Sequence, residues 1–166
     1  MGARQDEIVG AIEAAHRDFI ELVAGATPAQ WREPGANHPE IRFGEDEHRP
    51  VGVIAHHIAS AYAATIDRCQ AWIRGELPAP PTAETNAEHE SANPTPNHEE
   101  TIRLLDDNAN RLKDFARGLS GEDLEATGLF VSGRSSSVGK MLGETTPYHI
   151  GWHAGSIRAT WAQMAG

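Results

Sequence analysis

Apolar residues recur every three or four positions in four long stretches, and this periodicity limits the fold more than any other feature of the sequence. The stretches cover residues 8–22, 50–75, 97–119 and 137–164. The third is the most regular, with a stripe at Ile102, Leu105, Ala109, Leu112, Ala116 and Leu119. Such a spacing places the apolar side chains on one face of a helix, whereas a strand would alternate strictly. The sequence therefore predicts four amphipathic helices.

The segments between these helices indicate how they are connected. Residues 33–50 contain prolines and glycines among acidic residues, so we expect a long loop that covers part of the protein. Gly75 is expected to end the second helix. Residues 76–96 hold five prolines and predict a crossover or lid, with a helical turn at TNAEHE. Because neither half could bury a core alone, we expect one domain, residues 1–166, folded as an all-α four-helix bundle with a long crossover between helices two and three.

Charge and composition exclude several classes of function. The formal net charge is −10, and no segment gathers Lys and Arg with aromatic residues, so nucleic acid is not expected as a partner. No apolar run approaches the roughly 20 residues of a membrane span, and the first residues lack the pattern of a signal peptide. Cys69 is the only cysteine, which rules out an intrachain disulfide. We therefore expect a cytoplasmic protein.

The fourth helix carries two histidines in the segment PYHIGWHAGSIR. His149 and His153 are four residues apart, so their side chains project from one face, one turn apart, at a spacing that lets both bind one metal ion. Val138, Leu142 and Thr145 precede His149 at helical intervals, which predicts that the pair faces inward. Two buried imidazoles need a reason, since they would repel each other if protonated and need partners if neutral.

The second helix supplies a third histidine in VGVIAHHIASA. His57 lies beside the apolar stripe, whereas His56 is rotated by about 100° and is expected to face another helix or solvent. Metal sites in helical bundles use side chains from facing helices. Three imidazoles would leave coordination positions open for water or a substrate. The alternative is a metal-free interaction bundle whose histidines are ordinary core residues.

These segments resemble the DinB superfamily of metal-binding four-helix bundles, which includes bacterial thiol-dependent S-transferases of the bacillithiol and mycothiol type. PVGVIAHHIASA is similar to the second helix of that family, in which a His precedes an aliphatic residue, as His57 precedes Ile58. YHIGWHAGSIR is similar to its last helix, whose second His is followed by a variable residue and Gly, here Ala154 and Gly155. The resemblance covers nearly the whole chain.

The sequence departs from the family pattern at two positions. Pro147 should kink the last helix just before His149, because proline removes a backbone hydrogen bond. Ser156 stands where many relatives carry Gln.

The resemblance implies one divalent ion, most readily zinc or nickel, bound by His57, His149 and His153. It implies an enzyme that transfers a low-molecular-weight thiol to an electrophilic small molecule. The alternatives are a metal-dependent hydrolase and a non-catalytic, stress-related metal-binding module. A homodimer is a further alternative to a monomer.

No residue is assigned as a general acid or base, and several remain candidates for a role near the metal. The candidate acid or base groups are Tyr62, Tyr148 and Glu144. The cavity could be lined by residues that could equally serve in ordinary packing: Ser60, Ala61, Ala64 and Ser156. His89 could reach the cavity as part of a lid, although a solvated loop residue is the favoured interpretation.

The remaining notable residues have ordinary interpretations. Four histidines are expected at the surface: His16, His38, His48 and His98. The acidic run Glu45–Glu47 is expected on a solvated loop face. Three tryptophans at helical positions are expected in the core or in a dimer contact: Trp72, Trp152 and Trp161. Cys69 is expected to be an unreactive core thiol.

Overall fold

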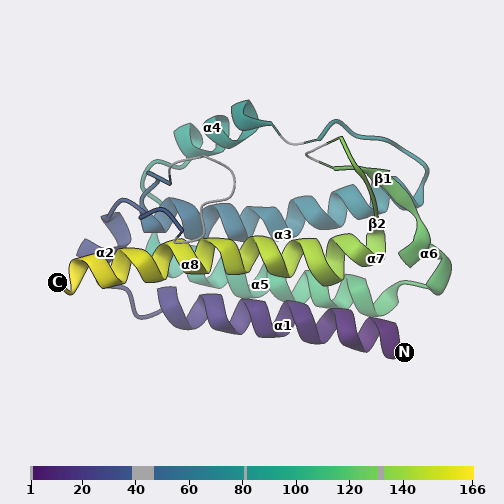
Figure 1. Ribbon diagram of the computed structural model, residues 1–166, viewed down its shortest axis with the longest axis horizontal. Helices are drawn as coiled ribbons and strands as arrows, with labels where there is room; N and C mark the ends of the chain where they lie inside the picture. Colours follow the sequence, from purple (N-terminus) through teal and green to yellow (C-terminus); the bar gives the residue numbers. More distant parts are fainter. Residues whose placement is uncertain (1, 39–46, 81, 131–132) are drawn as a thin grey trace.

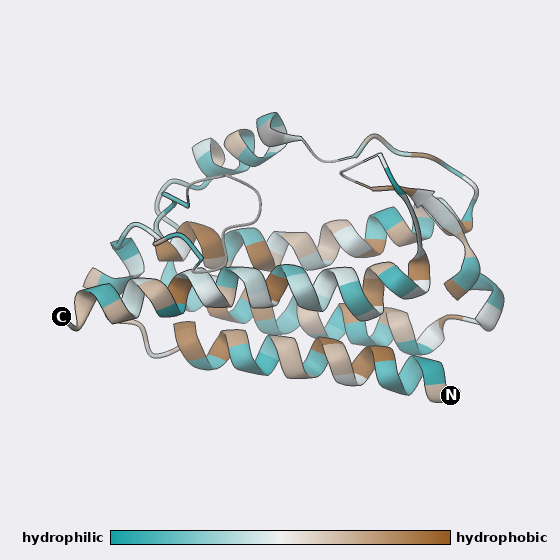
Figure 2. Ribbon diagram, in the orientation of Figure 1, coloured by the Kyte–Doolittle hydropathy of each residue, from teal (hydrophilic) through white to brown (hydrophobic). Residues whose placement is uncertain are grey.

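The computed structural model describes residues 2–38, 47–80, 82–130 and 133–166, and in this part of the chain four long helices run side by side (Figure 1). They are α1 (Ala3–Val23), α3 (Val51–Ile73), α5 (His98–Gly118) and a last helix that ends with α8 (Thr146–Met164). Hydrophobic and hydrophilic residues alternate around these helices (Figure 2), as an amphipathic pattern requires. The predicted four-helix bundle is confirmed.

The bundle closes around one apolar core, to which all four helices contribute. Its largest completely buried aliphatic and Phe side chains are Ile12, Phe19, Ile54, Ile58, Leu105, Leu112, Leu124, Leu142, Ile150 and Ile157. α3 packs mainly on α5, and α1 packs on both α5 and α8. The backbones of α3 and α8 approach each other at fewer places. This wider spacing leaves room for large side chains between α3 and α8. No helix in the described ranges has the length and apolarity to cross a membrane.

Local signals set the helix ends. α3 ends in a Schellman motif, in which the Gly75 amide donates to the Trp72 carbonyl and the Glu76 amide donates to the Ala71 carbonyl. Gly75 has a φ of 76°, a conformation that glycine adopts without steric cost. The short helix α2 (Pro28–Arg32) begins with a complete capping box at Thr27.

The predicted crossover between α3 and α5 is present, and it contains a helix longer than the single turn expected. This helix, α4 (Ala83–Ala92), begins at a capping box on Thr82. A short helix, α6 (Gly121–Glu125), and a two-stranded hairpin, β1 (Thr127–Leu129) with β2 (Ser135–Ser137), follow α5. Each strand has three residues, which is too short to show alternation in the sequence.

Pro147 changes the last helix differently from the predicted kink. The helix begins as α7 (Val138–Lys140) and passes through a π-helical turn, η1 (Met141–Thr145), before α8. The amide and the hydroxyl of Thr146 both donate to the Met141 carbonyl, five residues earlier. The wider turn inserts one residue ahead of the proline, whose ring would clash with a regular helical turn. As a result Thr146, rather than the predicted Thr145, is the buried threonine.

His16 is buried in the core, so its predicted surface position was wrong. Its Nδ1 lies 3.2 Å from the Tyr62 hydroxyl, and its Nε2 lies 3.0 Å from an oxygen of Asp106. Burial lowers the pKa of His16, although the neighbouring Asp106 opposes the shift. Burial, with a smaller contribution from Asp106, raises the pKa of Tyr62, a direction that keeps its hydroxyl protonated. The chain of contacts links α1, α3 and α5, and it runs from the buried Tyr62 and His16 to Asp106 at the surface.

Replacing Tyr62 by Phe should leave a buried nitrogen of His16 without a partner. We expect Tyr62→Phe to lower the free energy of unfolding by about 1–3 kcal/mol, measured by urea denaturation. The control Tyr148→Phe removes an exposed hydroxyl and should change stability by less than about 0.5 kcal/mol. Equal stability of the two variants would show that the contact between Tyr62 and His16 contributes nothing.

Candidate metal centre

Three histidines that are far apart in the sequence meet in the space between α3 and α8. His57 comes from α3, and His149 and His153 come from successive turns of α8. The Nε2 atom of His149 lies 3.3 Å from Nε2 of His57 and 3.1 Å from Nε2 of His153. The three rings stand nearly edge to face. The structure thus brings together the three residues that the sequence selected.

The electrostatics of this cluster keep the three imidazoles neutral. Burial lowers the pKa of His57 to about 2, with further lowering by His149 and His153. Burial likewise lowers the pKa of His149 to about 3. The pKa of His153 is also lowered by burial, although Glu47 partly opposes this. Neutral imidazoles with converging Nε2 atoms offer lone pairs to one cation, and the three residues could hold a metal ion.

Glu47 supports the cluster from behind. Its Oε2 lies 3.5 Å from Nδ1 of His153, an approach too loose to count as a hydrogen bond to that buried nitrogen. The same carboxylate receives two hydrogen bonds, of 2.8 and 2.6 Å, from the guanidinium of Arg49. Burial alone would raise the pKa of Glu47, but His153 and Arg49 hold it far below its ordinary value. A carboxylate on the outer nitrogen of a histidine fixes which nitrogen carries the proton. A hydrogen bond from Nδ1 of His153 to this carboxylate would leave the Nε2 lone pair facing the cluster.

The prediction of a solvated acidic loop was therefore wrong for Glu47, whose side chain is only 9% exposed. Glu45 lies outside the described residues. No periodic pattern marks Glu47, since it precedes α3 in a loop. Only its proximity to the second helix, ten residues before His57, could have indicated a role.

The same loop lies against α8 beside the histidines. The ring of His38 stacks on Trp152 at 4.3 Å, and the Ala36 amide donates to the Thr160 hydroxyl. A Cβ atom at Gly155 would lie 2.0 Å from His38, so only glycine admits this contact. The loop does cover part of the protein, as the sequence predicts, and the predicted surface position of His38 was wrong.

Two further histidines adjoin the cluster on the side of the crossover. Nδ1 of His56 lies 2.9 Å from Nε2 of His89, and the Ser60 hydroxyl lies 3.4 Å from the same nitrogen. The ring of His89 stands 5.6 Å from that of His57. His56 faces another helix, as predicted. The favoured prediction of a solvated loop residue at position 89 was wrong, because His89 lies on α4 and is half-buried.

The candidate acid or base groups lie away from the three histidines. Tyr62 contacts His16 in the core, Tyr148 is 57% exposed, and Glu144 is also exposed. Ser156 is completely buried, and its hydroxyl has no hydrogen-bond partner among the described residues.

The structure also tests the burial predicted for the remaining tryptophans, histidines and the cysteine. Trp72 and Cys69 are in the core, and burial raises the pKa of the Cys69 thiol to about 12. Trp161 packs partly against that core. His48 is exposed, as predicted. His98 is half-buried, with Nε2 2.9 Å from the Val23 carbonyl, so its predicted surface position was wrong.

The lowered pKa values predict how the metal-free protein responds to acid. Below about pH 6.5 the unfolded chain takes up protons on His57 and His149, whereas the folded chain does not until about pH 2 to 3. Stability should therefore fall as the pH decreases from 6.5 toward 3, measured as a lower urea midpoint at pH 5 than at pH 7.5.

A histidine substitution provides the control for this pH dependence. His57→Gln should fall less steeply in stability over the same interval, while His48→Gln, at an exposed position, should follow the wild type. A wild-type slope in His57→Gln would contradict the assignment.

Glu47→Gln should weaken zinc binding by about tenfold, because the neutral amide orients His153 less strongly. Competition with a chromophoric chelator measures the affinity. Glu76→Gln, which removes a carboxylate from an exposed pair with Arg74 at the other end of α3, should bind as the wild type does. The double variant Glu47→Gln, Arg49→Gln should remain weak; recovery would mean that the unpaired Arg49 charge, rather than the lost carboxylate, causes the effect.

Comparison with known proteins places this bundle in a family. A family model described as the DinB superfamily matches residues 7–160. Among solved structures, YfiT from Bacillus subtilis, described as a probable metal-dependent hydrolase with an unusual four-helix bundle topology, is similar with a TM-score of 0.77 and 18% identity. That match covers 99% of this chain and 90% of YfiT.

A mycothiol-dependent maleylpyruvate isomerase is also similar, with a TM-score of 0.71 and 18% identity; the match covers 95% of this chain but 63% of the isomerase. A single-residue mutant of that isomerase matches over the same shares, at 17% identity and a TM-score of 0.71. A search of curated proteins gave no significant match. Because the family model spans nearly the whole length, the chain belongs to the DinB superfamily.

Proposed function

We propose that this protein is a metal-dependent enzyme that transfers a low-molecular-weight thiol to an electrophile. His57, His149 and His153 bind one divalent ion in this proposal, with zinc or nickel the expected metals. The proposal is supported by the convergence of three Nε2 atoms: that of His149 lies 3.3 Å from that of His57 and 3.1 Å from that of His153. Such distances suit nitrogen atoms that share one ion.

The residues present fit such an ion. Burial lowers the pKa of all three histidines, so their lone pairs are free of protons at neutral pH. The Glu47 carboxylate lies 3.5 Å from the outer nitrogen of His153, on the side where second-layer carboxylates orient histidine ligands in metal sites. An ion with three protein ligands keeps positions open, where it would lower the pKa of a thiol or of water.

A thiol suits this site better than water does. An ordinary thiol has a pKa of about 8.5, whereas water has one of about 15.7, so a thiol needs less assistance to become a nucleophile. Among the described residues, no carboxylate joins the cluster of ligand nitrogens. The Glu47 carboxylate already accepts hydrogen bonds from Arg49 and lies 3.5 Å from Nδ1 of His153. A nucleophile that requires no protein base is the better match, and the mycothiol dependence of one structural neighbour supports the same choice.

Hydrolysis is the second candidate. The neighbour described as a probable metal-dependent hydrolase matches this chain over 90% of its own length, whereas the isomerase matches over 63%. A non-catalytic, stress-related metal-binding module is the remaining alternative.

We further propose that residues 1–166 act as one domain in the cytoplasm on a small-molecule substrate. The net charge of −10 argues against nucleic acid. For a homodimer, the exposed Tyr148 beside Trp152 on α8 is the aromatic surface to examine first.

Metal analysis of protein purified without a His tag tests the ligand set. The wild type should hold about one ion per chain, and His57→Ala and His153→Ala should lose most of it, because two imidazoles bind a divalent ion far less tightly than three. His56→Ala is the matched control, since His56 faces His89, and it should retain the metal. Metal-free wild type, or full metal in His57→Ala, would refute the site.

The same variants test the reaction. Zinc-loaded and nickel-loaded wild type should consume thiols in the presence of an electrophile, and a chelator or His153→Ala should abolish this, while His56→Ala remains active. Hydrolysis of an activated ester without thiol consumption would favour the second candidate. If metal-loaded protein showed neither activity, the non-catalytic metal-binding module would be the remaining interpretation.

A further inference from the structure

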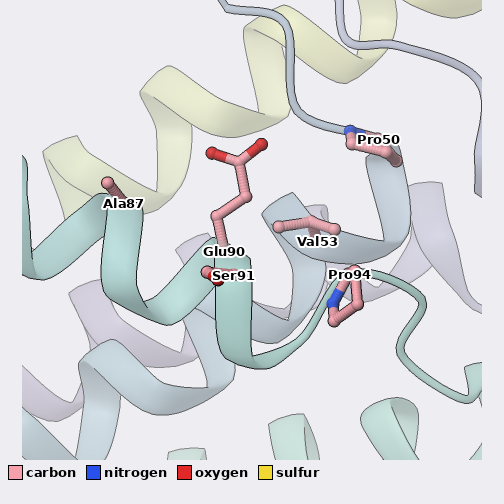
Figure 3. Close-up of a pocket in the computed structure, with 6 residues that line it drawn as sticks. All are labelled: Pro50, Val53, Ala87, Glu90, Ser91 and Pro94. Atoms are coloured by element: carbon pink, nitrogen blue, oxygen red, sulfur yellow. The ribbon is translucent and has the colours of Figure 1, made fainter.

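A cleft of about 400 Å³ lies between the start of α3 and the crossover helix α4 (Figure 3). It is lined by Pro50, Val53, Ala87, Glu90, Ser91 and Pro94. The volume falls in the range of pockets that bind small organic molecules. Val53 is buried, and Glu90 is half-buried.

Both helices that line the cleft also carry histidines of the candidate metal centre or next to it. On α3, Val53 lies four residues before His57, which places it one turn away on the same face. On α4, Glu90 follows His89, the residue that contacts His56 and stands beside the ring of His57. α4 thus directs Glu90 toward the cleft and His89 toward the histidines. A molecule in the cleft would therefore lie beside a residue that is one helical turn from a metal ligand.

The lining defines the chemistry of an occupant. Pro50, Ala87 and Pro94 offer apolar surface, Val53 forms the buried floor, and Glu90 is the one ionisable side chain among the six. Figure 3 shows the Glu90 carboxylate extending from α4 into the space between Ala87 and Pro50. Nε2 of His48 lies 3.9 Å from Oε1 of Glu90, beyond hydrogen-bond distance, on a side chain that is 75% exposed. The carboxylate can therefore accept a second partner.

We propose that this cleft binds the organic part of the substrate, and that this substrate carries a protonated amine that pairs with Glu90. The substrate class is thus an amine with an apolar body. Its role as substrate rests on the proposed function. The apolar residues bury the body, and the Glu90 carboxylate selects the ammonium group over a neutral or anionic one.

Benzylamine, benzyl alcohol and phenylacetate are matched probes that share one ring and differ in charge. Each is titrated into zinc-loaded protein while the methyl resonances of Val53 and Ala87 are followed by NMR. Benzylamine should shift both methyl resonances to saturation and bind more tightly than benzyl alcohol, and phenylacetate should bind most weakly. Equal affinities for the three probes, or shifts that avoid Val53 and Ala87, would overturn the proposal.

Substitutions on α4 separate the charge from the cavity. Glu90→Gln should weaken benzylamine by about threefold or more while leaving benzyl alcohol unchanged, as expected for a partly exposed ion pair. Glu88→Gln is the matched control, because Glu88 is exposed on the same helix and does not line the cleft. Ala87→Phe should weaken both probes by filling the space. An unchanged benzylamine affinity in Glu90→Gln refutes the role of the carboxylate.

The link to the metal centre has its own readout. Benzylamine should compete with an electrophile in thiol transfer by the wild type, and it should compete less well in Glu90→Gln. If benzylamine bound in the cleft but the protein consumed no thiol, the proposed function would be refuted, while the proposal that the cleft binds an amine would stand. Thiol transfer that benzylamine does not inhibit would refute the substrate role of the cleft and leave the proposed function intact.

Discussion

The arrangement of this protein depends on a space between α3 and α8 that imidazole rings fill instead of aliphatic side chains. Three rings converge there, each with its pKa lowered by burial, so the cluster is uncharged at neutral pH. Neutral nitrogens that face one another cannot all find hydrogen-bond partners among themselves, because each ring carries only one proton. A shared cation would satisfy all three lone pairs, which is why this space points to a metal.

The rest of the bundle supports that cluster. Glu47, which is paired with Arg49, lies next to the outer nitrogen of His153. The loop before α3 lies on α8 where Gly155 has no side chain. On the opposite side the crossover helix places His89 against His56 and Glu90 at the cleft. The two longest non-bundle segments, which the sequence marks only as loop and crossover, therefore both border the site.

Periodicity and capping residues were enough to predict the helices, because each depends on contacts within a few positions along the chain. The three histidines could be selected for a related reason: two lie one helical turn apart, and the third lies on a stripe that must face the core. His16 could not be placed this way. Whether a polar side chain on the edge of a stripe is buried depends on partners from other helices, here Tyr62 and Asp106.

The sequence by itself determined the four helices, their order and the faces that carry His57, His149 and His153, since helical geometry follows from local spacing. Only the tertiary structure decided that Glu47 contacts His153, that α4 lies beside the site, and that a π-helical turn before Pro147 moves Thr146 into the core. Loop conformations and helix offsets are set by packing between segments distant in the chain, and no local pattern encodes those distances.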